Sequence, residues 1–202
     1  MRPPPERQTN LTDPDSALMR KSRRREFRQA YNAQAAVDAD GSRLVLATEV
    51  GRSPSDAPTF QATVDTLQAV LGRPATILAD AGFAHGEVVG ALEQRGIDVL
   101  VAIDRGDTQR PYDFRPPPDP TKPPPRPPAA PWRLATPAKL QTETTKARYR
   151  TRKPTVEPAF GIVKSGLGFT RVQLRGLAKV NTEWRLLNRA YNCKRLHEPM
   201  AA

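Results

Sequence analysis

Short apolar runs of strand length alternate with helix-like segments through the first half of the chain. The segment from Tyr31 to Val50 contains two such runs around Asp40-Gly41, a residue pair typical of hairpin turns. The stretches ATILADAGF and IDVLVAI supply two more, and each follows a segment with helical periodicity. Because strands that alternate with helices form sheets with parallel pairs, this pattern predicts an α/β fold.

Several helices are expected from capping signals and apolar periodicity. Asp56 is suited to cap a helix that stops at Gly72, and a second helix is expected from His85 to Arg95. Residues 140–149 and 156–167 also have helical patterns. A final helix is expected to turn one apolar stripe toward the core, and its Trp is expected to pack there rather than to stack on a ligand. The stripe consists of Leu177, Val180, Trp184, Leu187 and Tyr191.

Proline divides the chain into parts. Residues 111–137 hold twelve of the twenty-two prolines, and such a stretch cannot continue a sheet because proline lacks the backbone N–H. We expect an extended, exposed insertion that acts as a spacer. The predicted organisation is a disordered basic arm (1–30), an α/β core (31–110), the Pro-rich insertion (111–137) and a basic helical part that carries Glu157 (138–198).

Charge is distributed unevenly along the chain, whose net charge is +11. Residues 139–202 carry fourteen Lys and Arg against four acids. This basic third predicts a polyanionic partner, nucleic acid rather than membrane, because no Trp- and Leu-rich anchoring face accompanies it. No window resembles a membrane span and the N-terminus lacks an apolar signal core, so we expect a cytoplasmic protein.

Cysteine and histidine are too sparse to form the usual disulfide or zinc frameworks. The chain has one cysteine, Cys193, and two histidines far apart in sequence, His85 and His197. This composition argues against a disulfide framework and against a Cys/His zinc site. If the protein uses a metal ion, we expect carboxylate ligands.

Two acids stand out as candidate site residues. Asp80 ends an apolar strand, where ligand sites in open α/β sheets tend to lie, although the following Ala81-Gly82 also favours a turn or helix-cap role. Glu157 is the only acid between Thr144 and Thr182, at an expected helix start, and could be a solvated or first-turn acid. Phosphodiester chemistry needs two or three carboxylates to hold a pair of Mg²⁺ ions, which such acids could provide by converging.

Three motifs, taken in order, resemble a known protein family. The stretches YNAQAAVDADG, ILADAGF and YRTRKPTVEPAFGIVKSGLGFTRVQLRGLAKVNTEWRLLNRAYN are similar to the C-terminal part of DDE-type transposases of bacterial insertion sequences. The resemblance covers roughly residues 12–196. It implies an RNase H-like mixed sheet with flanking helices, a helical C-terminal region, and DNA transposition by metal-dependent phosphodiester cleavage and strand transfer.

The same resemblance assigns roles to individual residues. It makes Asp80 and Glu157 the second and third acids of the DDE triad, both catalytic and both ligands of Mg²⁺ or Mn²⁺. Tyr149, Arg152, Glu157 and Lys164 are similar to a Tyr-Arg-Glu-Lys signature, with one more residue between Arg and Glu than in some members. Lys153 could instead fill the Arg role. The residues expected to bind transposon-end and target DNA are Tyr149, Arg152, Lys153, Lys164, Arg171 and Arg175.

The first acid of the triad has no evident counterpart. No apolar strand ending in Asp precedes Tyr31, so we expect a truncated transposase whose sheet lacks its first strand. Asp38 could substitute, but it abuts the hairpin turn and a turn role is favoured. Two hypotheses follow: a transposase catalytic region, inactive alone and dependent on a homo-oligomer or an upstream fragment, or a noncatalytic DNA-binding remnant.

Overall fold

The computed structural model describes residues 9–20, 26–103 and 131–197, without the side chains of residues 131 and 133–135. It separates into two compact units. The first unit comprises Met1–Pro74 and Arg150–Ala202, and the second comprises Ala75–Tyr149. This division differs from the expected one, because the predicted core of residues 31–110 is shared between the units. Each unit is described by itself.

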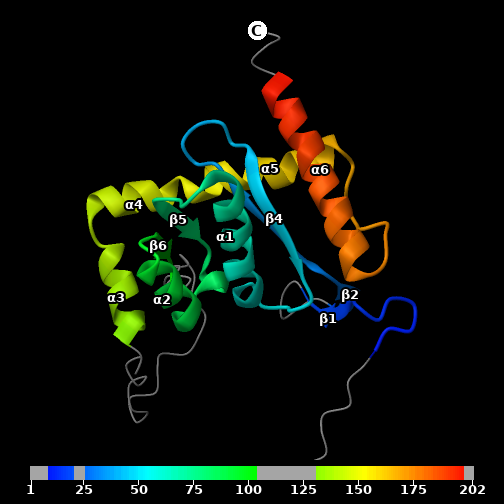
Figure 1. Ribbon diagram of the computed structural model, residues 1–202, viewed down its shortest axis with the longest axis horizontal. Coiled ribbons are helices and arrows are strands. Elements are labelled where there is room, and N and C mark those ends of the chain that lie inside the picture. Colours follow the sequence, from blue (N-terminus) through cyan, green and yellow to red (C-terminus); the bar gives the residue numbers. More distant parts are fainter. Residues whose placement is uncertain (1–8, 21–25, 104–130, 198–202) are drawn as a thin grey trace, which may run out of the picture. The chain divides into compact units, whose positions relative to one another are not determined.

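The first unit is built around an antiparallel hairpin (Figure 1). Strands β3 (Asn32–Val37) and β4 (Val45–Gly51) pair with Ala33 opposite Val50, and the register shifts between Ala36 and Val37. The predicted hairpin is therefore confirmed, with residues 38–44 as its connection.

Two helices cover opposite faces of this hairpin. Successive strand residues point to opposite faces, so Gln34 and its neighbour Ala35 face different helices. The Gln34 side chain donates to the carbonyl oxygen of Asp56 and accepts from Thr63 of α1 (Ala57–Leu71). Ala35 packs instead with the apolar cluster that includes residues of α6 (Leu177–His197). The two helices thus cover both faces of a sheet that has two strands within the described residues.

The boundaries of α1 were predicted in part. Gly72 ends the helix as expected, with a positive φ of 79° and its N–H donated to the carbonyl oxygen of Gln68. Asp56 occupies the N-cap position, but its side chain makes no capping hydrogen bond. Its carboxylate instead accepts from Nδ2 of Asn32 at 2.8 Å, so Asp56 ties α1 to β3.

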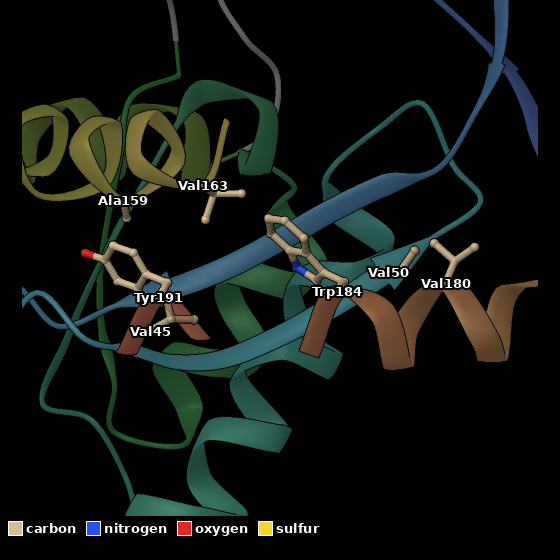
Figure 2. Packing of buried hydrophobic residues seen from close by; sticks show 7 residues of the cluster. All are labelled: Val45, Val50, Ala159, Val163, Val180, Trp184 and Tyr191. Carbon is tan, nitrogen blue, oxygen red and sulfur yellow. The ribbon is translucent and has the colours of Figure 1, made fainter. Parts of the chain in front are cut away.

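Figure 2 shows the main apolar cluster of the first unit. Trp184 and Tyr191 of α6 lie against β4, and residues of α5 complete the cluster. The indole N–H of Trp184 donates to the carbonyl oxygen of Gln34 at 2.8 Å, and the ring of Phe160 stacks at a centroid distance of 5.9 Å. Trp184 is 4 % exposed, which confirms its predicted packing role. The buried members are Val45, Val50, Ala159, Val163, Val180, Trp184 and Tyr191.

Residues 9–30 correct the prediction of a disordered arm where the structure describes them. Strands β1 (Ala17–Met19) and β2 (Arg28–Ala30) form an antiparallel pair, and Asp13 is buried. Strands were predicted from apolar alternation. Strands of only three residues are too short to show such a pattern, so the sequence did not indicate this pair. Residues 1–8 and the KSRRR run lie outside the described residues.

The second unit contains the predicted parallel strands. Strand β5 (Thr76–Ala79) pairs in parallel with β6 (Asp98–Val101), and they are joined through η1 (Ala81–Phe83) and α2 (Gly86–Gln94). The apolar side chains of β6 are buried, as are Val89 and Leu92 of α2. Within the described residues, the strands form three two-stranded sheets. The fold is therefore mixed α/β, as predicted.

Two more helices belong to the region around the Pro-rich stretch. Helix α3 spans Pro131–Lys139 and α4 spans Glu143–Arg150. The expectation of an extended chain is thus wrong for residues 131–137, whereas residues 111–130 lie outside the described residues. Lys139 pairs with Glu93 and, at 3.3 Å, with Asp98, which connects the end of α3 to α2 and β6.

Helix α5 (Arg152–Gly161) begins earlier than predicted and continues into a π-helical turn, η2 (Ile162–Gly166). No helix in the described part of the chain has both the length and the apolar character needed to cross a membrane.

Candidate active site and basic surface

Asp80 lies immediately after the last residue of β5. It is exposed, whereas the preceding Ala79 is buried. The Asp80 carboxylate accepts from the N–H of Gly82 at 3.4 Å, and its carbonyl oxygen accepts from the N–H of Phe83 at 2.9 Å. Asp80 therefore caps η1, as its alternative role predicted. The contact to Gly82 is long and therefore weak as a hydrogen bond.

Tyr149 anchors the backbone next to Asp80. Its hydroxyl, near the end of α4, donates to the carbonyl oxygen of Ala79 at 3.0 Å. Both residues belong to the second unit. The resemblance implied a DNA contact for Tyr149, and this hydrogen bond gives the hydroxyl a structural partner at the strand end. A DNA-binding role for Tyr149 remains a prediction.

Glu157 lies in the middle of α5 rather than at its start. Thr155 and Ala159 of the same helix are buried, whereas Glu157 is exposed. Within the described part of the chain, its carboxylate makes no hydrogen bond or ion pair. The first-turn explanation for this acid is therefore wrong, because the helix begins at Arg152. A solvated surface acid and a ligand-binding acid remain as alternatives.

The basic residues around Glu157 differ in their surroundings. Arg152 is partly buried, and Lys153 and Lys164 are exposed. We expected Lys164 on the same face as Glu157 from a continuous 3.6-residue repeat. The structure places Lys164 in η2, where the N–H of Leu167 bonds to the carbonyl oxygen of Ile162, so this repeat is interrupted. A common face for Lys164 and Glu157 therefore remains a prediction, and π-helical turns are frequent at functional sites.

Arg171 and Arg175 lie on the loop of residues 167–176, which connects η2 to α6. Both are exposed, and neither guanidinium has a hydrogen bond or ion pair within the described residues. The sequence analysis missed the residues that hold this loop in place. Asp13 and Glu183 accept hydrogen bonds from its backbone, and Asp15 accepts one from the N–H of Leu177, the next residue. Of these three acids, only Glu183 lies within the motifs that carry the family resemblance, so only Glu183 could have been noticed from the sequence.

Asp38 has the turn role that the sequence favoured. Its carboxylate accepts from the hydroxyl and N–H of Ser42 and from the N–H of Asp40. The hydrogen bond from the Ser42 side chain is the main cause that holds the pKa of Asp38 below its usual value. A carboxylate that accepts several loop donors is poorly suited to act as a further triad acid.

The two acids of the candidate site belong to different units, Asp80 to the second and Glu157 to the first. Their convergence on one site therefore remains a prediction. Within residues 9–20, 26–103 and 131–197, no three His, Cys, Asp or Glu side chains form a group that could hold a metal ion. The donor chemistry of Asp80 and Glu157 nevertheless fits a hard divalent cation, since both are exposed carboxylates.

Comparison with known proteins identifies the family. A family model described as the transposase DDE domain matches residues 6–193 of the 202-residue chain. No curated protein and no solved structure gives a significant match. The match extends over both units and includes β5 with Asp80 and α5 with Glu157. The chain therefore belongs to the transposase DDE domain family.

Proposed function

We propose that this chain acts in DNA transposition by metal-dependent phosphodiester cleavage and strand transfer, with Asp80 and Glu157 as site carboxylates. Family membership supports a function in transposition in general. The observation that carries the finer proposal is the position of Asp80. It is an exposed acid directly after a parallel strand, at the edge where α/β sheets bind ligands.

Asp80 and Glu157 would hold Mg²⁺ or Mn²⁺ in this proposal. Bound between these acids and the DNA, such ions supply charge stabilisation at the phosphate and activation of the attacking oxygen. The protein's own contribution is to orient the acids. Tyr149 fixes the backbone before Asp80. Thr155 and Ala159 pack the buried face of α5, which leaves Glu157 on the exposed face of that helix.

DNA is the proposed partner of the basic helical part, residues 138–198. The exposed cations Lys153, Lys164, Arg171 and Arg175 suit phosphate contacts, and Arg152 and Tyr149 would assist them. Electrostatic binding of this kind is largely independent of sequence and depends strongly on salt. Transposon ends and target DNA would both be bound in this way.

We further propose an RNase H-like arrangement for the core, residues 31–110, completed by the helical part. The family motifs match two acids of the triad, so a cleaving complex needs a further carboxylate. Two-stranded sheets have edges that can accept another strand. We therefore expect a second copy of the chain or a separate transposase fragment as partner.

A noncatalytic DNA-binding function is the alternative. It is favoured by the fourteen Lys and Arg against four acids in residues 139–202, which would bind DNA whether or not a metal site forms. The two functions differ in what they require of Asp80 and Glu157. Only the catalytic proposal needs both acids at one metal site.

Calorimetric titration of Mn²⁺ into the full chain tests the catalytic proposal. The variants are Asp80→Ala, Glu157→Ala and the double variant, with Glu143→Ala as an exposed acid elsewhere in the chain. If one site uses both acids, each single variant should weaken binding, and the double variant should lose less than the sum. Independent, additive effects would support two unrelated surface acids and the noncatalytic alternative.

A further inference from the structure

The loop of residues 167–176 displays two arginines that have no protein partner in the described residues. Arg171 and Arg175 are exposed, and the side chains of both extend from a segment without helical or strand structure. Three acids bind the backbone of this segment or the first residues after it. They are Asp13, Asp15 and Glu183.

Glu183 binds the middle of the loop. One carboxylate oxygen accepts from the N–H of Gln173 at 2.8 Å, and the other accepts from the N–H of Leu174 at 3.0 Å. These two residues lie between Arg171 and Arg175 in sequence. Glu183 is itself held in α6, one residue before the buried Trp184. The carboxylate thus fixes the loop backbone to a helix that is anchored in the core.

The two ends of the loop are also fixed. At its start, the N–H of Phe169 donates to the carbonyl oxygen of Val163, and the Phe169 ring lies 6.3 Å from the Trp184 ring. At its end, the N–H of Gly176 donates to Asp13 at 3.2 Å. The N–H of the next residue, Leu177, donates to Asp15 at 3.0 Å.

The choice of donors is informative. Acids near arginines usually form ion pairs with them, since Arg presents several donors to a carboxylate. Here the carboxylate of Glu183 is used by backbone N–H groups, and Arg171 and Arg175 remain unpaired within the described part. A loop that is already held in its binding conformation loses less conformational entropy when it binds. The arrangement keeps two guanidiniums accessible and their backbone ordered.

We infer that Glu183 is a positioning residue for DNA binding, which holds the 167–176 loop so that Arg171 and Arg175 contact the phosphate backbone of duplex DNA. This inference rests on the proposed DNA-binding function and adds an acid that promotes binding to a polyanion. The sign of its effect is therefore diagnostic. Removing an acid from a DNA-binding surface ordinarily reduces repulsion and strengthens binding, whereas removing Glu183 should weaken it.

The experiment measures affinity of the full chain for a duplex of arbitrary sequence over a salt series. The variants are Glu183→Ala, the pair Arg171→Ala with Arg175→Ala, and all three together. Asp40→Ala is the matched control, because Asp40 is an exposed acid of the same unit whose side chain has no partner within the described residues. Glu183→Gln, which keeps one acceptor oxygen, covers the case in which the Ala variant does not fold.

Each lost phosphate contact should make the slope of log affinity against log salt shallower by about 0.9. We expect a loss of up to about 1.8 for the arginine pair, from two such contacts, and a smaller loss in the same direction for Glu183→Ala. The triple variant should match the arginine pair, and Asp40→Ala should bind as tightly as the wild type or more tightly. Hydrogen exchange at the Gln173 and Leu174 amides should accelerate in Glu183→Ala.

If the wild type binds DNA and Glu183→Ala binds it equally or more tightly, the inference about Glu183 fails, while the proposed DNA-binding function stands. Equal weakening by Glu183→Ala with and without the two arginines would also overturn it, since the effect would not pass through them. If the wild type shows no salt-dependent DNA binding, the proposed DNA-binding function fails as well.

Discussion

The hydroxyl of Tyr149 donates a 3.0 Å hydrogen bond to the carbonyl oxygen of Ala79, the residue that precedes Asp80. Through this bond, the end of α4 fixes the carboxyl end of β5. A signature residue that the family resemblance assigned to DNA thus also supports the backbone of a candidate catalytic acid.

Replacing Tyr149 with Phe should destabilise the second unit. The variant keeps the ring but removes the donor to Ala79, and loss of such a bond costs about 0.5–1.5 kcal/mol. Hydrogen exchange should locate the effect in β5 and β6. Tyr191→Phe is the matched control, because its hydroxyl donates to the carbonyl oxygen of Arg43 in the first unit. Equal effects of the two variants on β5 would contradict this assignment.

Tyr31 should titrate well above the ordinary pKa of a tyrosine, which is about 10. Burial and its hydrogen bonds to Asp13, at 2.7 and 2.8 Å, raise the pKa of Tyr31 to about 12. Because the folded-state pKa is raised, the stabilisation is complete below the unfolded value of about 10 and is lost as pH rises through about 12. Absorbance titration of tyrosinate should show the late step in the wild type and not in Tyr31→Phe. An unchanged late step in Asp13→Asn would contradict the role of Asp13.

Lys164→Ala should reduce the salt dependence of DNA binding. Lys164 is exposed and has no partner within the described residues, so we expect it to contact a phosphate. Its loss should make the slope of log affinity against log salt shallower by about 0.9. Lys146→Ala should leave the slope unchanged, because Lys146 pairs with Glu143 at 3.0 Å. Similar slopes for both variants and the wild type would exclude Lys164 as a contact.

The purified chain should neither cut nor join DNA that carries the element's own ends, with Mg²⁺ or Mn²⁺. Two carboxylates can recruit such an ion, but without a further carboxylate the ions would not be held precisely at the phosphate. A misplacement of about 1 Å in a catalytic site can cost on the order of a hundredfold in rate. Gel-based cleavage and strand-transfer assays provide the measurement. Activity that both Asp80→Ala and Glu157→Ala abolish would contradict this expectation. It would indicate that Asp38 or a second copy of the chain, rather than a separate transposase fragment, supplies the third acid.

Sequence patterns predicted those parts of the fold that arise from local periodicity. The β3–β4 hairpin, the parallel β5 and β6, and the apolar stripe of α6 follow from side chains a few residues apart. The bond from Gly176 to Asp13 joins residues 163 positions apart, and no local pattern indicates it. The π-turn at Lys164 and the three-residue strands β1 and β2 were missed because neither has an apolar repeat.

The candidate site was predictable only in its residue types and local positions. Asp80 follows an apolar strand in the sequence and in the structure, and its exposure agrees with a ligand role. The interrupted helical repeat after Gly161 shows why spacing alone could not place Lys164 relative to Glu157. Long-range convergence of acids depends on how elements pack, which periodicity does not report.

A crystal structure of the full chain grown with Mn²⁺, with the ion located by its anomalous scattering, tests the central claim most directly. We predict an ion bound by the carboxylates of both Asp80 and Glu157, with Tyr149 still bonded to Ala79. An ion bound elsewhere, or the two carboxylates on opposite faces of the sheet, would contradict the account and leave Asp80 as a cap of η1 and Glu157 as a solvated acid.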